Sequence, residues 1–322
     1  LVLTRAGIAG LDLPEPQLSL DFGYYYPDGD SGRVFADWET FQAWRAANGK
    51  LREGAPRVAV GFFKASYYSG DMALIDAIIA EIERRGAEAV PVFGYPGAVA
   101  FEHLLGTGEA VRADVGLGLF FQFNDGESAN VLERVGIPVL NLVSLYGRSE
   151  EEWLSSTSGL SAFEGTFNLA SPELAGTIAP TVVGTKEKRR DPATGLSSVI
   201  TSPIRERVEI AVSRGLRYAE LARKANADKK VALIYYNYPP GKANIGASYL
   251  NVAETLANVL ERMAAEGYDI GGAPPSADEV LSEITTRGRN IAGHAPGELE
   301  ALIAEGGVQR LPVSDYRQWL DA

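Results

Sequence analysis

Apolar residues in the first half of the chain alternate between short continuous runs and helical spacings. The run Arg57–Lys64 (RVAVGFFK) is typical of a parallel strand that is covered on both faces. In Met72–Arg85 the apolar residues recur three and four positions apart, which predicts an amphipathic helix that Gly86 ends. Ala89–Phe93 follows as the next strand. This order predicts a right-handed βαβ unit.

The same alternation continues beyond this unit. Strands are predicted over Val115–Phe121 and Ile137–Val143, with a short helix over Ser128–Val135 between them. Ser149 and Glu152 then form the pattern of a capping box. We therefore predict a first doubly wound α/β domain over residues 57–184.

The N-terminal segment, residues 1–56, is rich in turn formers and aromatic residues. A helix is predicted over Asp37–Ala47, with Trp38, Phe41 and Trp44 on one face. Aromatic residues at this spacing usually belong to a core. We expect an arm that packs against the first domain.

Residues 185–228 interrupt the α/β pattern. Thr185–Ser202 reads as a surface loop, and Arg205–Ala225 as a long linking helix. The loop contains a basic cluster, Lys186, Lys188, Arg189 and Arg190. Either this cluster is a solvated surface, or it meets an anionic ligand.

The second half repeats the first module. A buried strand is predicted over Lys229–Tyr236, a helix over Tyr249–Ala265 ending at Gly267, and a strand at Tyr268–Ile270. We therefore expect residues 229–322 to form a second doubly wound, mainly parallel α/β domain, complete or cut short.

The long connection between the strand and the helix of this second module is the main candidate site. It exceeds the 2–6 residues that usually join such elements, and it follows the carboxyl end of a strand, where doubly wound sheets bind ligands. Gly241-Lys242 precedes a helix but lacks the spacing of a phosphate-binding loop. Either the loop is inert or it binds a ligand, and its candidate residues are Tyr235, Tyr236, Asn237, Tyr238, Lys242, Asn244, Ser248, Tyr249 and Asn251.

The corresponding loop of the first module, 64–71, is a secondary candidate. It brings Ser66, Tyr67, Ser69 and Asp71 to the N-terminus of a helix, where backbone N–H groups favour anions. The alternative is that Ser69 or Asp71 only caps the helix. Gln122–Glu127 after the third strand either lines the same crevice or forms a turn and cap.

Composition excludes several classes of function. The chain of 322 residues has no Cys, which excludes thiol catalysis and Cys-ligated metals, and its two His are too few for a multi-His site. The net charge of −12 argues against general nucleic-acid binding. No apolar run reaches the ~20 residues of a membrane span. Residue 1 is Leu and no signal peptide follows, so we expect a chain trimmed by processing or a piece of a longer one.

Three stretches carry a family resemblance. Lys230–Ile270 (KVALIYYNYPPGKANIGASYLNVAETLANVLERMAAEGYDI) resembles a signature segment of the large subunit of class I tetrapyrrole metal chelatases, the family that includes the CobN-type cobaltochelatase and magnesium chelatase large subunits. Arg57–Pro96 is similar to the family's earlier α/β unit. Asn168–Gly176 is similar to the family's PE-x-DG stretch, which adds Glu173 as a candidate, although Ala175 stands where the family has Asp.

The resemblance implies insertion of Co²⁺ or Mg²⁺ into a corrin or porphyrin, or removal of a metal, as in cobalamin biosynthesis. The metal is then a substrate, and ATP is used by separate AAA+ partner subunits. Tyr side chains of the loop would stack on the ring, and amide, hydroxyl and Lys groups would meet its carboxylates. The sequence nominates no catalytic base and no resident metal site.

This chain departs from the family in length. Family subunits are much longer, and their His-Gly-x-x-Glu-x-x-Pro-Gly segment is missing here, since His294–Gly297 does not match it. We therefore expect a fragment, inactive alone, or a short relative. The alternative is a non-enzymatic two-domain ligand-binding protein of the periplasmic type, and the expected location is cytoplasmic, or periplasmic if a signal peptide was removed.

Overall fold

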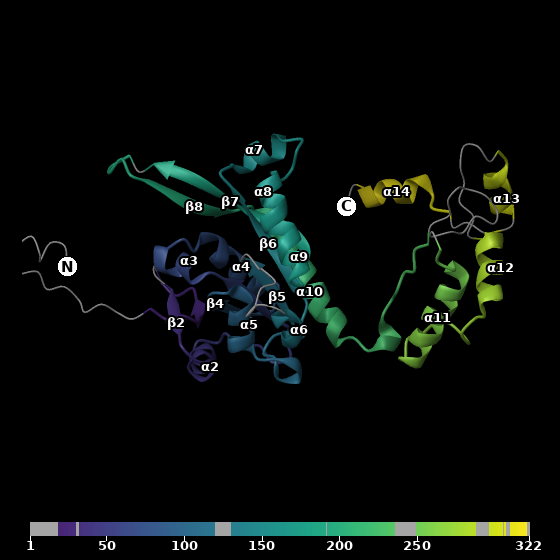
Figure 1. Cartoon of the computed structure of the whole chain (residues 1–322), viewed down its shortest axis with the longest axis horizontal. Coiled ribbons are helices and arrows are strands. Elements are labelled where there is room, and N and C mark those ends of the chain that lie inside the picture. The colour runs from purple at the N-terminus through teal and green to yellow at the C-terminus, as the bar shows by residue number, and fades with distance from the viewer. Residues whose placement is uncertain are drawn as a thin grey trace, which may run out of the picture. The chain divides into compact units, whose positions relative to one another are not determined.

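The computed structural model describes residues 19–29, 32–119, 130–190, 192–235, 249–287, 296–304, 306 and 310–320 (Figure 1). Contacts divide the chain into two compact units, Leu1–Arg223 and Lys224–Ala322. Each unit is described by itself.

The first unit is built on one eight-stranded mixed sheet with the order β2-β1-β4-β3-β5-β6-β7-β8. Its parallel strands are β3 (Arg57–Phe62), β4 (Glu88–Phe93), β5 (Val115–Leu119), β6 (Val139–Tyr146) and β7 (Ile178–Arg190). Antiparallel strands flank them on both sides: β1 (Gly23–Tyr26), β2 (Arg33–Phe35) and β8 (Ser197–Pro203).

Helices cover both faces of this sheet. Alternate residues of β3 point to opposite faces, so Val58 and Val60 join one apolar cluster and Ala59 joins the other. The first cluster packs beneath α4 (Ala73–Arg84) and α10 (Arg205–Arg223), the second beneath α2 (Trp38–Ala47), α5 (Gly97–Leu105) and α6 (Val131–Val135). The predicted doubly wound α/β fold is confirmed for this unit.

Shorter elements fill the connections of the first unit. They are α3 (Lys64–Ser69), the 3₁₀ turn η1 (Gly108–Ala110), α7 (Glu150–Ser155), α8 (Ala162–Gly165), the π-helical turn η3 (Thr166–Ala170) and α9 (Ser171–Leu174). The predicted capping box of Ser149 and Glu152 is present at α7. Helix α3 was not predicted, because its sequence KASYYS has no apolar stripe.

The N-terminal segment contributes to the sheet itself. Strand β1 pairs with β4, and its consecutive tyrosines are divided between the two clusters. Asp37 caps α2 by accepting a hydrogen bond from the Thr40 amide at 2.8 Å. Phe41 is fully buried and stacks on Tyr24 at a centroid distance of 4.9 Å. The predicted helix and the core role of Phe41 are confirmed.

The prediction of a surface loop over Thr185–Ser202 is wrong. These residues form most of an antiparallel hairpin between β7 and β8, and Figure 1 shows the two strands continuing outward as a ribbon. Thr185 and Thr201 are buried, whereas the basic side chains of Lys188 and Arg190 are exposed. Charged residues are common on exposed sheet edges, where they prevent pairing with other chains. Because of these charged residues, the sequence of the strand lacks the apolar pattern from which a strand is predicted.

In the second unit, the described elements are helices. After the 3₁₀ turn η4 (Asn226–Asp228) come α11 (Val252–Ala265), α12 (Ala277–Arg287), α13 (Glu298–Ala304) and α14 (Val313–Leu320). A small apolar cluster of Ala253, Val280 and Ile284 joins α11 to α12.

The strands predicted at Lys229–Tyr236 and Tyr268–Ile270 are corrected by the structure. Residues 229–235 and 268–270 form no strand, and Ile234 is 95% exposed. A strand needs a partner for its backbone groups, and the described part of this unit offers none. The described residues of this unit therefore show no second doubly wound domain.

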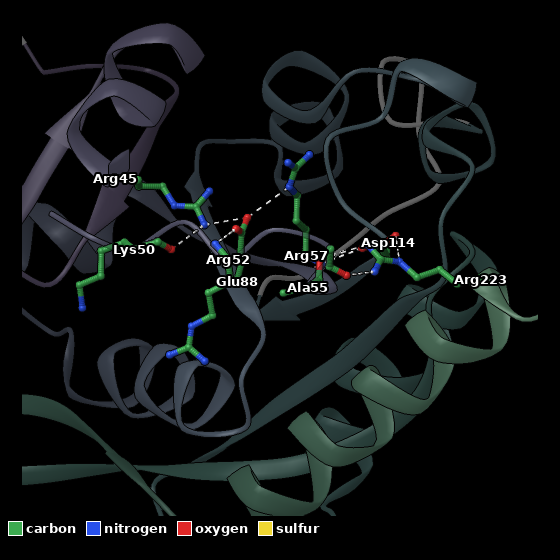
Figure 2. A network of polar contacts seen from close by, with 9 residues as sticks. Arg45, Lys50, Arg52, Ala55, Arg57, Glu88, Asp114 and Arg223 are labelled. Atoms are coloured by element: carbon green, nitrogen blue, oxygen red, sulfur yellow. Dashed lines mark hydrogen bonds and ion pairs between the residues drawn. The ribbon is translucent and has the colours of Figure 1, made fainter. Parts of the chain in front are cut away.

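A polar network fixes the amino ends of the parallel strands (Figure 2). Glu88 at the start of β4 forms ion pairs with Arg45 at 3.0 Å and with Arg57 at 3.2 Å. Arg223, the last residue of α10, donates two hydrogen bonds of 2.9 Å to the carboxylate of Asp114, which precedes β5. The charges at this edge are paired with one another, so the opposite, carboxyl edge is the place to search for a site.

Candidate functional site

A cavity of about 80 Å³ lies at the carboxyl edge of the sheet. Strand β3 continues through α4 to β4 on one side, and β4 continues through α5 to β5 on the other, so the strand order reverses between β3 and β5. Ligands of doubly wound folds bind at this reversal. The cavity is lined by Phe62, Phe63, Ser66, Asp71, Leu74, Ile75, Leu119, Asn141, Leu142, Val143, Ser144, Tyr146, Phe163, Asn168, Lys186 and Thr201.

The strand register places a lysine between two polar neighbours on the cavity wall. Lys186 of β7 pairs with Tyr146 of β6 on one side and with Thr201 of β8 on the other. Residues paired across strands point to the same face. The β7–β8 hairpin, which was predicted as a surface loop, therefore supplies the basic group of this cavity.

Asp71 is tied to the same hairpin. Its carboxylate accepts a hydrogen bond of 2.9 Å from the amide of Thr201 and one of 2.5 Å from the Thr201 hydroxyl. The cap position of α4 is Met72, and Ser69 donates to the carbonyl of Ser66 at 3.2 Å. The capping alternative for Asp71 and Ser69 is therefore wrong, and Asp71 instead fastens the α3–α4 connection to β8.

The other residues predicted in the first loop fall into two groups. Ser66 lines the cavity. Tyr67 packs into the core, where its ring stacks on Phe93 with centroids 5.9 Å apart. Glu173 is exposed on α9 and does not line the cavity. The segment Gln122–Glu127 lies outside the described residues.

Sequence reasoning missed two asparagines of the cavity wall. Asn141 is buried on β6, and its amide donates a hydrogen bond of 2.5 Å to the carbonyl of Asn168 on η3. The signal was present, because Asn141 interrupts the otherwise apolar run Ile137–Val143. A buried polar residue in a strand needs a partner, and that partner comes from a distant turn.

Glu164 supports the end of β6 next to the cavity. Its carboxylate accepts a 3.0 Å hydrogen bond from the Tyr146 amide and pairs with Arg148 at 2.5 Å. Burial raises the pKa of Glu164, but the hydrogen bonds from Ser161 and Tyr146 and the charge of Arg148 outweigh it and lower this pKa overall. Glu164 thus holds Tyr146 at the cavity mouth.

Most of the loop predicted as the main site lies outside the described residues. This applies to Tyr236, Asn237, Tyr238, Lys242, Asn244 and Ser248. Tyr235 packs against the small cluster of α11 and α12, and burial raises its pKa. Tyr249 is fully exposed, and Asn251 caps α11 by accepting a hydrogen bond from the Glu254 amide at 3.2 Å.

The cavity offers donors and a positive charge to a ligand. Its mouth has aromatic surface, since Tyr146 is 64% exposed and Phe163 59%. No cluster of three or more His, Asp or Glu side chains suited to a metal ion occurs among the residues with described positions. None of the helices in the described ranges is long and apolar enough to cross a membrane. The first unit thus has a doubly wound α/β architecture, a class in which small molecules are commonly bound at the switch point.

Comparison with known proteins identifies the family. The profile of the CobN/Magnesium Chelatase family matches residues 3–322, so the chain belongs to the CobN/magnesium chelatase family. The magnesium-chelatase H protein of Rhodobacter capsulatus, a chelatase subunit, is 31% identical over 317 residues, which cover 92% of this chain and 25% of that protein. The aerobic cobaltochelatase subunit CobN of Sinorhizobium sp is 27% identical over 326 residues, 98% of this chain and 24% of that protein.

A solved structure agrees on the fold. The catalytic subunit of cobaltochelatase from Mycobacterium tuberculosis superimposes with a TM-score of 0.63 at 20% identity, over 87% of this chain and 23% of that one. The chain therefore spans between a fifth and a quarter of the length of relatives such as the chloroplastic magnesium-chelatase subunit ChlH of Oryza sativa subsp. indica, of which it covers 20%.

Proposed function

We propose that this chain is the part of a metal chelatase large subunit that binds the tetrapyrrole, a corrin or a porphyrin, into which Co²⁺ or Mg²⁺ is inserted or from which it is removed. The observation that carries the proposal is the family membership together with a cavity of mixed apolar and polar lining at the switch point of the sheet. In the proposed reaction the metal is a substrate and AAA+ partner subunits supply the energy of ATP. We propose that this reaction takes place in the cytoplasm, where ATP is available.

The chain contributes binding and orientation to this reaction. Aromatic side chains at the cavity mouth offer a flat apolar surface to a macrocycle, and the polar wall meets its side groups. The sequence nominates no base for the pyrrole protons, and we propose that the base belongs to another part of the large subunit or its partners. We accordingly propose that the chain alone binds the ring without metallating it.

A titration tests the binding. Deuteroporphyrin added to the chain quenches tryptophan and tyrosine fluorescence if it binds near these side chains, and the expected curve saturates. A metallation assay with Co²⁺, Mg²⁺ and added ATPase subunits is expected to give no metalloporphyrin. Absence of saturable binding contradicts the proposed function, and metallated product contradicts the division of labour.

The proposal extends to the long loop between Tyr235 and Asn251. The loop residues predicted from sequence are proposed to bind a tetrapyrrole. Tyr238→Ala and Lys242→Ala are expected to weaken porphyrin binding by about 1 kcal/mol or more each, the scale of one aromatic contact or charge-assisted hydrogen bond. Tyr235→Ala is the matched variant for stability, because Tyr235 packs against α11 and α12. Unchanged affinity in both loop variants contradicts this extension.

A further inference from the structure

We propose that the cavity at the carboxyl edge is a subsite for one carboxylate arm of the ligand, with Lys186 as its charge partner. The assignment rests on the proposed function for the identity of the ring, but the subsite itself is argued from the cavity alone. One carboxylate of the ligand occupies the cavity, and Lys186 binds it.

Lys186 carries a positive charge on the cavity wall. It forms no ion pair with any described residue, although the chain has 42 acidic against 30 basic residues. At the opposite edge of the sheet, Arg45, Arg57 and Arg223 each pair with a carboxylate. An unpaired cation on a cavity wall favours an anionic group of a ligand beside it.

The acidic residue of the cavity, Asp71, forms no ion pair with this lysine. Asp71 lines the same cavity, but one of its oxygens accepts the Thr201 amide and the other the Thr201 hydroxyl. Asp71 and Lys186 are therefore both present without pairing to each other. The carboxylate of Asp71 remains a repulsive neighbour, so the ligand group must reach Lys186 without crowding Asp71.

Hydroxyl groups complete the donor set. The side chains of Ser66 and Ser144 line the cavity and form no hydrogen bond with a described residue. Ser144 lies two residues before Tyr146 on β6, the strand that pairs with the Lys186 strand. A carboxylate has several acceptor positions and is suited to one ammonium and two hydroxyl donors.

The size of the cavity selects a short arm. About 80 Å³ holds a few water molecules or a short acid chain, whereas pockets that enclose whole ligands measure roughly 300–1,000 Å³. The ring itself must stay outside. The exposed rings of Tyr146 and Phe163 at the mouth are placed to contact it.

The test compares two lysines of one strand face. Lys186→Gln removes the charge in the cavity, and Lys188→Gln removes the next charge on the same face, which is exposed and outside the cavity. Each protein is titrated with deuteroporphyrin, which carries two carboxylates, with its dimethyl ester, and with glutarate as a probe without a ring. Thermal unfolding of all variants shows that they fold.

Lys186→Gln is expected to lower the affinity for deuteroporphyrin and for glutarate about tenfold, the scale of a charge-assisted hydrogen bond. The affinity for the dimethyl ester is expected to stay unchanged. Lys188→Gln is expected to change the affinity for each ligand by less than about twofold, because an exposed charge is screened. Equal losses in both variants, or no glutarate binding to the wild type, overturn the subsite. Glutarate binding that depends on Lys186, with no porphyrin binding at all, keeps the subsite and overturns the proposed function.

Discussion

At the scale of single residues, a buried ion pair joins α2 to the start of β4. Arg45 is 1% exposed and pairs with Glu88, while its Nε and Nη1 atoms have no hydrogen-bond partner. Burial lowers the pKa of Arg45, and the carboxylate of Glu88 opposes that shift. The charge of Arg45 is thus tolerated only because Glu88 is present.

Removing this carboxylate is expected to destabilise the first unit. Glu88→Gln leaves Arg45 buried without a counter-ion, and we expect a loss of about 3 kcal/mol in the free energy of unfolding, measured with urea. Asp28→Asn is the matched control, because the ion pair of Asp28 with Arg33 is exposed, and we expect a change below about 1 kcal/mol. Similar losses in the two variants contradict the assignment.

Single residues were also the hardest to predict from sequence. Ser66 and Asp71 were expected near the site because they follow an apolar strand, and both line the cavity. Asn141 and Lys186 were missed or left open, because their roles depend on strand pairing between segments distant in sequence. Local patterns do not contain that pairing.

At the scale of elements, the end of β6 is held by α8. The Glu164 carboxylate joins the capping box of this helix to the Tyr146 amide and to Arg148. The single carboxylate of Glu164 bonds to a helix N-terminus, to the end of a strand and to a cation. Protonation of Glu164 is therefore expected to weaken all three contacts together.

The low pKa of Glu164 predicts a pH effect. A carboxyl whose pKa is lower in the folded state stabilises the fold above its unfolded value of about 4.3, and this contribution is lost as the pH falls through the folded pKa. Glu164→Gln is expected to be less stable than wild type at pH 7, with the difference shrinking below about pH 4. Urea unfolding across this range measures it, with the exposed Glu151→Gln as control. A difference independent of pH contradicts the prediction.

Close packing between elements predicts the effect of two glycine substitutions. A Cβ on Gly184 of β7 would lie 2.8 Å from the Leu74 Cδ2 atom of α4 and 2.8 Å from the Ser202 carbonyl oxygen, whereas one on Gly165 of α8 meets nothing within 4 Å. We expect Gly184→Ala to destabilise the fold by about 1–3 kcal/mol. Gly165→Ala is expected to be neutral or stabilising by up to about 1 kcal/mol. Chemical denaturation decides, and a neutral Gly184→Ala contradicts this packing.

At the scale of the whole molecule, apolar runs predicted well where a sheet surrounds them. Residues 57–62 form β3, with β4 and β5 on either side. The run at 229–235 has the same apolar character and forms no strand, because a strand is defined by its neighbours. The hydrophobic pattern thus indicates that a segment is suited to a buried strand. Whether the segment pairs as a strand depends on the rest of the fold.

Hydrogen exchange tests this contrast between the two runs. The amides of residues 230–234 form no backbone hydrogen bond to a described residue, and Ile234 is 95% exposed. We therefore expect them to exchange within seconds at low protein concentration, whereas the β3 amides are protected for hours by the sheet. Because an exposed apolar segment pairs readily with other chains, we also expect self-association as the concentration rises. Ile234→Lys should reduce that association without altering the unfolding of the first unit. Protection of residues 230–234 equal to that of β3 at low concentration would show that the predicted strand forms after all.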